Sequence, residues 1–148
     1  MRVIVQRVRH ASVTIDGEVH GSVGRGYMTL TGFTDGDTEE TVKKVADKVA
    51  DLRIFEDEND KMNLTIFDVG GAVLSISQFT LYADVSKGRR PSFVKAMRPQ
   101  PASQLYDFFN ECLRKRGLQV ETGIFGADMK VELLNDGPVT IIVDSEVL

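Results

Sequence analysis

The sequence has little of the chemistry from which most catalytic and metal sites are built. Its 148 residues include one cysteine, no tryptophan and two histidines. The single Cys112 cannot form an intrachain disulfide, which favours a reducing compartment. No apolar run approaches the roughly 20 residues of a membrane-spanning helix, and Met1–Arg7 lacks the long apolar stretch of a signal peptide. We therefore expect a cytoplasmic protein without a membrane span.

The few reactive side chains do not form a familiar catalytic or metal motif. His10 and His20 lie in or beside predicted strands, without cysteine or carboxylate neighbours at metal-ligand spacing. Cys112 falls on the apolar face of a predicted helix, where a thiol is usually unreactive. The glycine-rich segment 21–26 matches neither dinucleotide nor P-loop spacing, and a tight turn explains it better. We expect no metal and no cofactor.

The overall composition is that of an ordinary globular chain, but its charge is uneven. Hydrophobic residues make up 42% and the net charge is −4, which argues against general polyanion binding. Between residues 85 and 106, however, five residues are basic and none is acidic. We call these five the basic strip: Lys87, Arg89, Arg90, Lys95 and Arg98. Either a solvated loop or a phosphate-binding surface explains such a strip.

Strand patterns outnumber helix patterns along the chain. Two amphipathic helices are predicted, one with an N-cap at Asp37 and one that contains Cys112 and ends at Gly117. The turn signal Asp16-Gly17 predicts a hairpin. Strands are predicted over residues 3–8, 12–23 around that turn, 27–33, 72–81, 130–134 and 139–143. The pattern favours a single α+β domain over residues 1–148, with an antiparallel or mixed sheet.

Two short segments are unusual for their predicted surroundings. Ser77-Gln78-Phe79-Thr80 places polar groups near the end of an apolar strand, where they either hydrogen-bond within the sheet or serve a purpose. Asn135-Asp136-Gly137-Pro138 reads as a turn between two strands. Proline cannot donate to a strand ladder, however, and glycine allows another molecule to approach the backbone closely. A rigid edge that presents carbonyls is the alternative for this second segment.

At these two segments the sequence resembles the D-aminoacyl-tRNA deacylase family, also called the D-tyrosyl-tRNA deacylases. The likeness continues in several further motifs in the same order, so it extends over nearly the whole chain. The matching stretches are residues 77–82 and 135–140, with 5–8, 53–55, 61–64, 87–93, 121–123 and 125–129 around them.

The resemblance implies a barrel-like α+β fold that forms a homodimer with active sites at the subunit interface. It also implies a cis bond between Gly137 and Pro138, and insertion of this dipeptide into the pocket of the other subunit as a chirality filter. Residues expected to line the pocket beside the scissile ester are Ser77, Gln78, Phe79 and Thr80, with Met129 at its side and Arg7 orienting the carbonyls of Gly137 and Pro138.

The implied activity is hydrolysis of the ester of D-aminoacyl-tRNA, and also of glycyl-tRNA, while L-amino acids are excluded by a rigid backbone wall. The basic strip is then expected to contact tRNA phosphates. Backbone N–H groups near Phe79 and Thr80, together with the 2′-hydroxyl of the terminal adenosine, could carry the reaction without a catalytic triad. The competing mechanism makes Thr80 a covalent nucleophile, although no activating base is evident.

Two other classes of function stay open from the residues alone. A non-catalytic RNA-binding module would use the basic strip with Phe79, Tyr82 and Phe93 as stacking groups. A metal-dependent hydrolase of another small ester would need ligands that the sequence does not offer.

Overall fold

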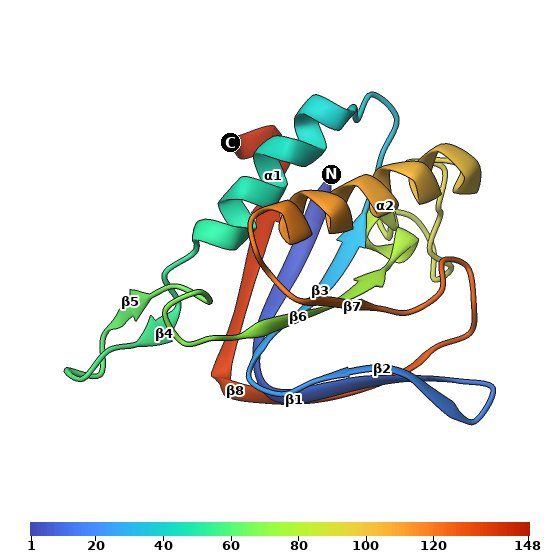
Figure 1. Cartoon of the computed structure of the whole chain (residues 1–148). Helices are drawn as coiled ribbons and strands as arrows, with labels where there is room; N and C mark the ends of the chain where they lie inside the picture. Colours follow the sequence, from blue (N-terminus) through green and yellow to red (C-terminus); the bar gives the residue numbers. More distant parts are fainter.

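A mixed β-sheet forms the centre of the computed structural model, which describes residues 1–148 (Figure 1). Its order is β2-β1-β3-β6-β7, and β8 pairs with β1. The β3–β6 and β6–β7 pairs are parallel, while all pairs made by β1 are antiparallel. The strands are β1 (Arg2–Ile15), β2 (Glu18–Val23), β3 (Gly26–Gly32), β6 (Ala72–Ser77), β7 (Val120–Thr122) and β8 (Lys130–Asp144).

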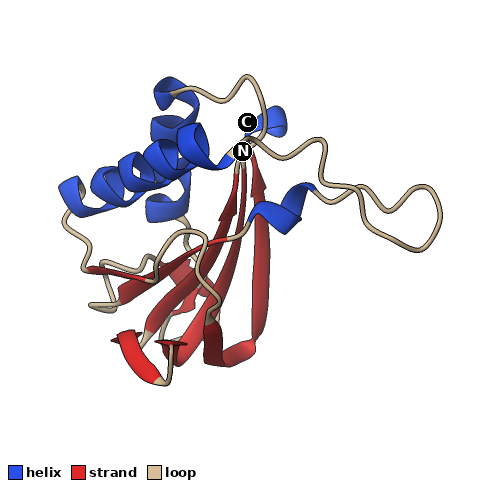
Figure 2. Ribbon diagram, turned by 90° about the vertical axis from the view of Figure 1, so that its right-hand side faces the viewer, coloured by secondary structure: helices blue, strands red, loops and turns tan.

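Two helices, α1 (Glu39–Asp51) and α2 (Pro99–Lys115), cover one face of this sheet (Figure 2). Each places apolar residues at helical spacing against the sheet, such as Val42, Val45 and Val49 in α1, and the main core of 22 buried residues lies between the two layers. The Tyr106 hydroxyl of α2 donates to the Ser75 carbonyl of β6 at 2.6 Å. Neither helix is long and apolar enough to cross a membrane.

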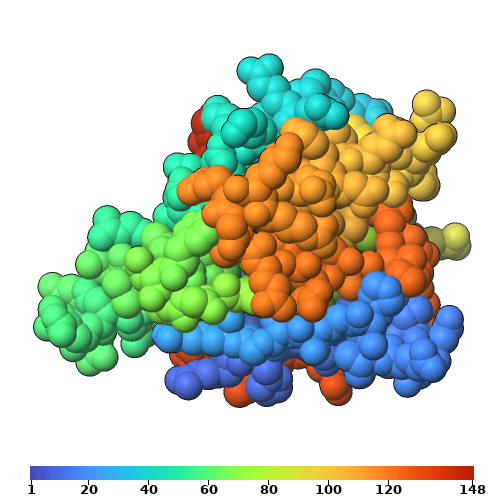
Figure 3. Space-filling model, viewed as in Figure 1, coloured from blue at the N-terminus to red at the C-terminus, as the bar shows by residue number.

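The sheet curls into a nearly closed, barrel-like shape because its two longest strands, β1 and β8, bend together. Their pairing register shifts twice, between Gln6 and Val8 and between Val8 and Ala11. Such irregularities bend a strand and increase its twist. The curl encloses a second, smaller core that includes Val8, Met28 and Ile76. The short hairpin of β4 (Phe55–Glu56) and β5 (Met62–Leu64) projects from the side of the molecule (Figure 3).

The predicted α+β class with two helices and a mixed sheet is confirmed, but several boundaries differ. The N-cap of α1 is Thr38, which forms a capping box with Thr41, whereas Asp37 accepts a hydrogen bond from the Thr34 N–H at 2.8 Å. The strand predicted over residues 72–81 ends at Ser77 and continues as the 3-10 helix η1 (Phe79–Tyr82). A second 3-10 helix, η2 (Ser145–Val147), follows β8.

The segment 135–138 does not separate two strands as predicted. It lies within the continuous strand β8, at the first register shift, where residues 136–139 face the single residue Arg7 of β1. The extra residues leave the ladder as a bulge. Glycine, together with residues that do not need ladder hydrogen bonds, is typical both of a turn and of a bulge. The sequence pattern alone therefore could not distinguish these two local structures.

Candidate functional site

A cavity of about 250 Å³ opens where β6 ends, between this strand and the loop that enters β8. Four of the sequence-predicted site residues line it: Ser77, Gln78, Phe79 and Met129. The other lining residues are Ile76, Phe125, Gly126, Ala127, Asp128 and Val131. Residues 125–128 were not predicted as site residues, although Phe125-Gly126-Ala127-Asp128 lies in one of the stretches that carry the family resemblance. We call this space the reaction cavity.

The backbone that leaves the reaction cavity offers two N–H groups without an acceptor in the chain, one on the lining residue Phe79 and one on Thr80, which follows it and does not itself line the cavity. The Gln78 N–H extends the parallel ladder by donating to the Thr31 carbonyl at 2.8 Å, after which the chain turns into η1. The Leu81 N–H then donates to the Gln78 carbonyl at 3.3 Å. The N–H groups of Phe79 and Thr80 precede the first bond of the helix and stay free, as at any helix start. Such paired donors can bind a developing oxyanion.

The Thr80 side chain is exposed and has one hydrogen-bond partner, the Gln78 amide nitrogen, which donates to the Thr80 hydroxyl oxygen. No histidine, lysine or carboxylate hydrogen-bonds to this hydroxyl. A threonine hydroxyl needs a base to remove its proton before it can act as a nucleophile near pH 7. The surroundings of Thr80 therefore supply no activating group.

Arg7 anchors the bulge that carries Gly137 and Pro138. The residue is 5% exposed, and its guanidinium donates from Nε to the Asp136 carbonyl at 3.1 Å and from Nη1 to the Ile54 carbonyl at 2.7 Å. The Gly137–Pro138 bond is cis. Arg7 was predicted to hold the carbonyls of Gly137 and Pro138, whereas the bulge carbonyl that it binds belongs to the preceding residue, Asp136, and Gly137 lies beside the guanidinium.

Gly137 is required by the backbone at this place. Its φ is +129°, in the region that side chains of L-residues rarely adopt. An added Cβ would lie 2.8 Å from Val139 Cγ2 and 3.0 Å from Arg7 Nη2. Both Gly137 and Pro138 are exposed. The bulge thus exposes its backbone at Gly137 to solvent and to any molecule that binds there.

Within one chain, this bulge and the reaction cavity lie far apart. Arg7 of β1 lies opposite Tyr27 of β3, which lies opposite Val73 of β6. Ser77 of β6 lies four residues further along this strand, in the row that contains Thr31 of β3 and Val3 of β1. Four residues span about 13 Å, and the three strand spacings from β8 to β6 add about 14 Å across the sheet. Neither Gly137 nor Pro138 lines the reaction cavity of its own chain.

The basic strip occupies the long loop between η1 and α2, which Figure 2 shows as a projection beyond η1. All five of its residues are exposed. Lys95 pairs with Asp84 at 3.5 Å, while the other four cations have no carboxylate within salt-bridge distance. The structure thus leaves most of the strip free to meet anions from outside the chain.

A second and larger cavity, of about 540 Å³, adjoins the reaction cavity on the side of this loop. Phe79, Phe125 and Gly126 line both cavities. We call the larger one the apolar groove, and its remaining lining residues are Phe93, Ala96, Met97, Arg98 and Pro99. Arg98 belongs to the basic strip and Phe93 is one of the possible stacking groups, and their meeting in one groove is not evident from the sequence.

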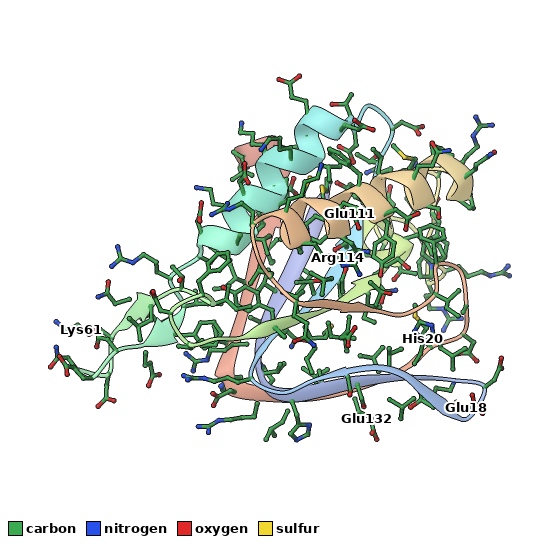
Figure 4. All side chains as sticks on the ribbon, viewed as in Figure 1. Glu18, His20, Lys61, Glu111, Arg114 and Glu132 are labelled. Atoms are coloured by element: carbon green, nitrogen blue, oxygen red, sulfur yellow. The ribbon has the colours of Figure 1, made fainter.

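The histidines and the cysteine lie outside the reaction cavity. The His20 ring nitrogen Nδ1 is 2.8 Å from the Thr122 carbonyl, which ties β2 to β7 (Figure 4). Burial raises the pKa of the Cys112 thiol, so this group stays protonated at neutral pH. Figure 4 also shows Glu111 and Arg114 on the side of α2 toward β7, where the Arg114 guanidinium donates to the Val120 carbonyl at 3.0 Å.

The family model described as "D-Tyr-tRNA(Tyr) deacylase" matches residues 4–144. A D-aminoacyl-tRNA deacylase from Brevibacillus brevis is 62% identical over 98% of this chain and all of its own length. One from Geobacillus sp. is 58% identical over 99% of this chain and 96% of its own length.

Among solved structures, one described as "c-Myc DNA Unwinding Element Binding Protein" is 41% identical, with a TM-score of 0.91, over 97% of this chain and 98% of its own. Another, of a probable eukaryotic D-amino acid tRNA deacylase, is 21% identical with a TM-score of 0.83, over 96% and 97%, and supports the fold. The predicted membership in a family of hydrolases that act on aminoacyl-tRNA esters is confirmed. This chain belongs to the D-Tyr-tRNA(Tyr) deacylase family.

Proposed function

We propose that residues 1–148 act as one D-aminoacyl-tRNA deacylase domain, which hydrolyses the ester between a D-amino acid and the 3′ end of tRNA. The observation that carries this proposal is the pair of free N–H groups of Phe79, which lines the reaction cavity, and of Thr80, which follows it, in a chain of this family. Because charged tRNA is a cytoplasmic molecule, this function also places the protein in the cytoplasm. No cofactor takes part in the proposed reaction.

In the proposed mechanism, the ester carbonyl lies at the rim of the reaction cavity and accepts hydrogen bonds from these two N–H groups. Water attacks the carbonyl carbon, and the two donors stabilise the oxyanion that forms. The bond to the 3′-oxygen then breaks, this oxygen takes up a proton, and the free D-amino acid and tRNA leave. The neighbouring 2′-hydroxyl of the terminal adenosine directs the proton transfer, so that no side-chain base is required. An aminoacyl ester is already activated, which makes positioning and charge stabilisation sufficient.

The alternative in which Thr80 attacks the ester receives no support from its surroundings. The only hydrogen-bond partner of the Thr80 hydroxyl is the Gln78 amide, which donates to its oxygen and cannot remove its proton. An activating base is missing as well. We assign Thr80 and Gln78 to shaping the cavity, while Ser77 and Met129 line it.

We further propose that the enzyme is a homodimer whose Gly137–Pro138 bulge enters the reaction cavity of the partner subunit. The position of the bulge supports this arrangement, because Gly137 and Pro138 do not line the cavity of their own chain and are exposed to solvent. Carbonyls of a rigid bulge would capture the α-amino group of the substrate and leave no space for an L side chain. Glycine has no side chain to exclude, so glycyl-tRNA should also be cleaved.

The basic strip completes the proposal by contacting tRNA phosphates. Four of its cations have no carboxylate partner, and one of these, Arg98, lines the groove that adjoins the reaction cavity. Lys and Arg contacts to phosphates position a nucleic acid without reading its sequence. This placement would let one enzyme accept tRNAs of different sequence.

The decisive experiment compares matched D- and L-aminoacyl-tRNA, following loss of the ester with limiting enzyme. We expect the D substrate to be cleaved at least about a thousandfold faster, which corresponds to roughly 4 kcal/mol of transition-state discrimination. Equal rates would refute stereospecific deacylation, and binding without turnover would favour an RNA-binding module. Glycyl-tRNA that stays intact would show that selection depends on positive contacts to a D side chain.

A further inference from the structure

The apolar groove is larger than the reaction cavity and is not needed to hold the scissile ester. At about 540 Å³ it lies within the range of pockets that bind small molecules and cofactors. The two spaces share the wall formed by Phe79, Phe125 and Gly126, so a chain that leaves the reaction cavity over this wall enters the groove directly.

The lining of the groove suits a flat aromatic ring. Phe93 is 40% exposed and Phe79 is 54% exposed, although phenylalanine is normally buried. The two rings meet edge to face, with centroids 5.1 Å apart, so this contact covers one face of one ring and leaves the other faces of the pair for another partner. Exposed phenylalanines beside a reactive site are the groups on which single-stranded nucleic acids stack their bases.

The charge around the groove indicates an anionic occupant. Arg98 lines the groove without a carboxylate partner, and the other members of the basic strip stand on the same loop. The start of α2 contributes little, because Pro99 and Pro101 have no N–H to donate. The positive charge is therefore carried by side chains, as in grooves that follow a nucleic-acid backbone.

We propose that the apolar groove binds the penultimate nucleotide of the tRNA 3′ end, with its base stacked on Phe93 and its phosphate near Arg98. This inference rests on the proposed deacylase function. The terminal adenosine carries the ester and must lie at the reaction cavity, so the nucleotide that precedes it is the first to cross the shared wall. The 3′ end of tRNA is single-stranded, which leaves the faces of its bases free for stacking.

The test uses two D-tyrosyl esters that differ only in length, one of adenosine and one of the trinucleotide CpCpA. The measured quantity is the ratio of their kcat/KM values, trinucleotide over adenosine. We expect wild type to favour the trinucleotide by about 5- to 150-fold, the factor that corresponds to roughly 1–3 kcal/mol for a stacked base. Phe93→Ala should lower the ratio at least about fivefold, and Phe93→Tyr should restore it.

Taking a ratio removes effects that reach the reaction cavity through the contact of Phe93 with Phe79, because these act on both esters. Phe67→Ala is the matched control, since Phe67 is 38% exposed and its ring lies under Arg116, away from the groove. This control should keep the wild-type ratio. Phe93→Leu, which keeps an apolar side chain without a ring, should behave like Phe93→Ala if stacking matters.

Three outcomes would overturn the proposal, and they differ from one another. A wild-type ratio near one, with both esters cleaved, would remove the groove from substrate binding while the deacylase function stands. An unchanged ratio in Phe93→Ala, with dissociation to monomers in light scattering, would assign the groove to a second copy of the chain. Cleavage of neither ester and of no D-aminoacyl-tRNA would refute the deacylase function itself.

Discussion

Replacing Arg7 by lysine tests how the Gly137–Pro138 bulge is held in place. The Arg7 guanidinium binds two carbonyls from different parts of the chain, Asp136 at 3.1 Å and Ile54 at 2.7 Å, at a site that is 5% exposed. A lysine keeps the charge, but its single ammonium head cannot reproduce the two directions of the planar fork. At least one carbonyl then loses its partner in a buried place.

The size of the effect follows from these contacts. A hydrogen bond to a charged group contributes about 1.5–3 kcal/mol, and a buried carbonyl left without a partner costs about 1–3 kcal/mol. The ion pair of Arg7 with Glu56, at 3.6 Å, adds little because Glu56 is exposed. We therefore expect Arg7→Lys to lower the free energy of unfolding by about 2–4 kcal/mol.

Urea unfolding at equal protein concentration measures this loss, with Arg9→Lys as the matched control. Arg9 also contacts Asp136, from Nε to the carboxylate at 3.2 Å, but its side chain is 66% exposed. Its replacement should change the free energy of unfolding by less than about 1 kcal/mol. The fixed concentration matters, since the stability of the proposed dimer would depend on it.

A second measurement separates anchoring from simple stability. If Arg7 orients the bulge through the Asp136 carbonyl, the ratio of D to L cleavage should fall in Arg7→Lys under conditions where the protein stays folded. Equal stability losses in the two variants would show that the buried hydrogen bonds are not the anchor. A large stability loss with an intact D/L ratio would show that Arg7 supports the fold without orienting the chirality filter.

Further predictions concern the reaction, the tRNA contacts and the cysteine. Thr80→Ala should keep the single-turnover rate of deacylation within about tenfold of wild type, whereas a substrate without the 2′-hydroxyl should be nearly inert. A large loss of rate in Thr80→Ala, with the deoxy substrate still cleaved and a trapped acyl-enzyme, would make Thr80 the nucleophile. Replacing Lys87 and Arg89 by alanine should raise KM and flatten its salt dependence without altering the D/L ratio, and an unchanged salt slope would return them to a solvated loop. Because burial raises the pKa of the Cys112 thiol, N-ethylmaleimide should label it more slowly at pH 7 than free cysteine does.

Local features of the fold could be predicted from the sequence because neighbouring residues determine them. The Asp16-Gly17 hairpin forms where predicted, with positive φ at both residues, as a tight two-residue turn requires. Both helices are present because the spacing of their apolar residues specifies a buried face. The position of a cap is less certain from sequence: Asp37 and Thr38 are both good N-caps, and the contact of Asp37 with Thr34 leaves Thr38 to begin the helix.

Features that depend on distant parts of the chain could not be predicted in the same way. The three residues of β7 form a strand because β6 offers them a parallel edge, which no local pattern announces. The bulge in β8 follows from the register of β1, and the placement of Ser77 beside residues 125–129 follows from the sheet order. The candidate site residues were identified through the family resemblance, since the residues alone favoured ordinary structural roles for both segments.

A site that acts through backbone groups needs few reactive side chains, which agrees with their scarcity in this sequence. In the proposed mechanism, the oxyanion is bound by two N–H groups and the substrate amine by carbonyls of the bulge, groups that almost every residue possesses. Such a site depends on the residues that fix the backbone in place. Gly137 is one of these residues, because an added Cβ would press on Val139 and Arg7. Arg7 is another, since it fixes the carbonyl just before the dipeptide. Clusters of histidine, cysteine or carboxylate residues therefore do not mark this site, whereas glycine, proline and a buried arginine around a register shift mark the bulge that we propose as its chirality filter.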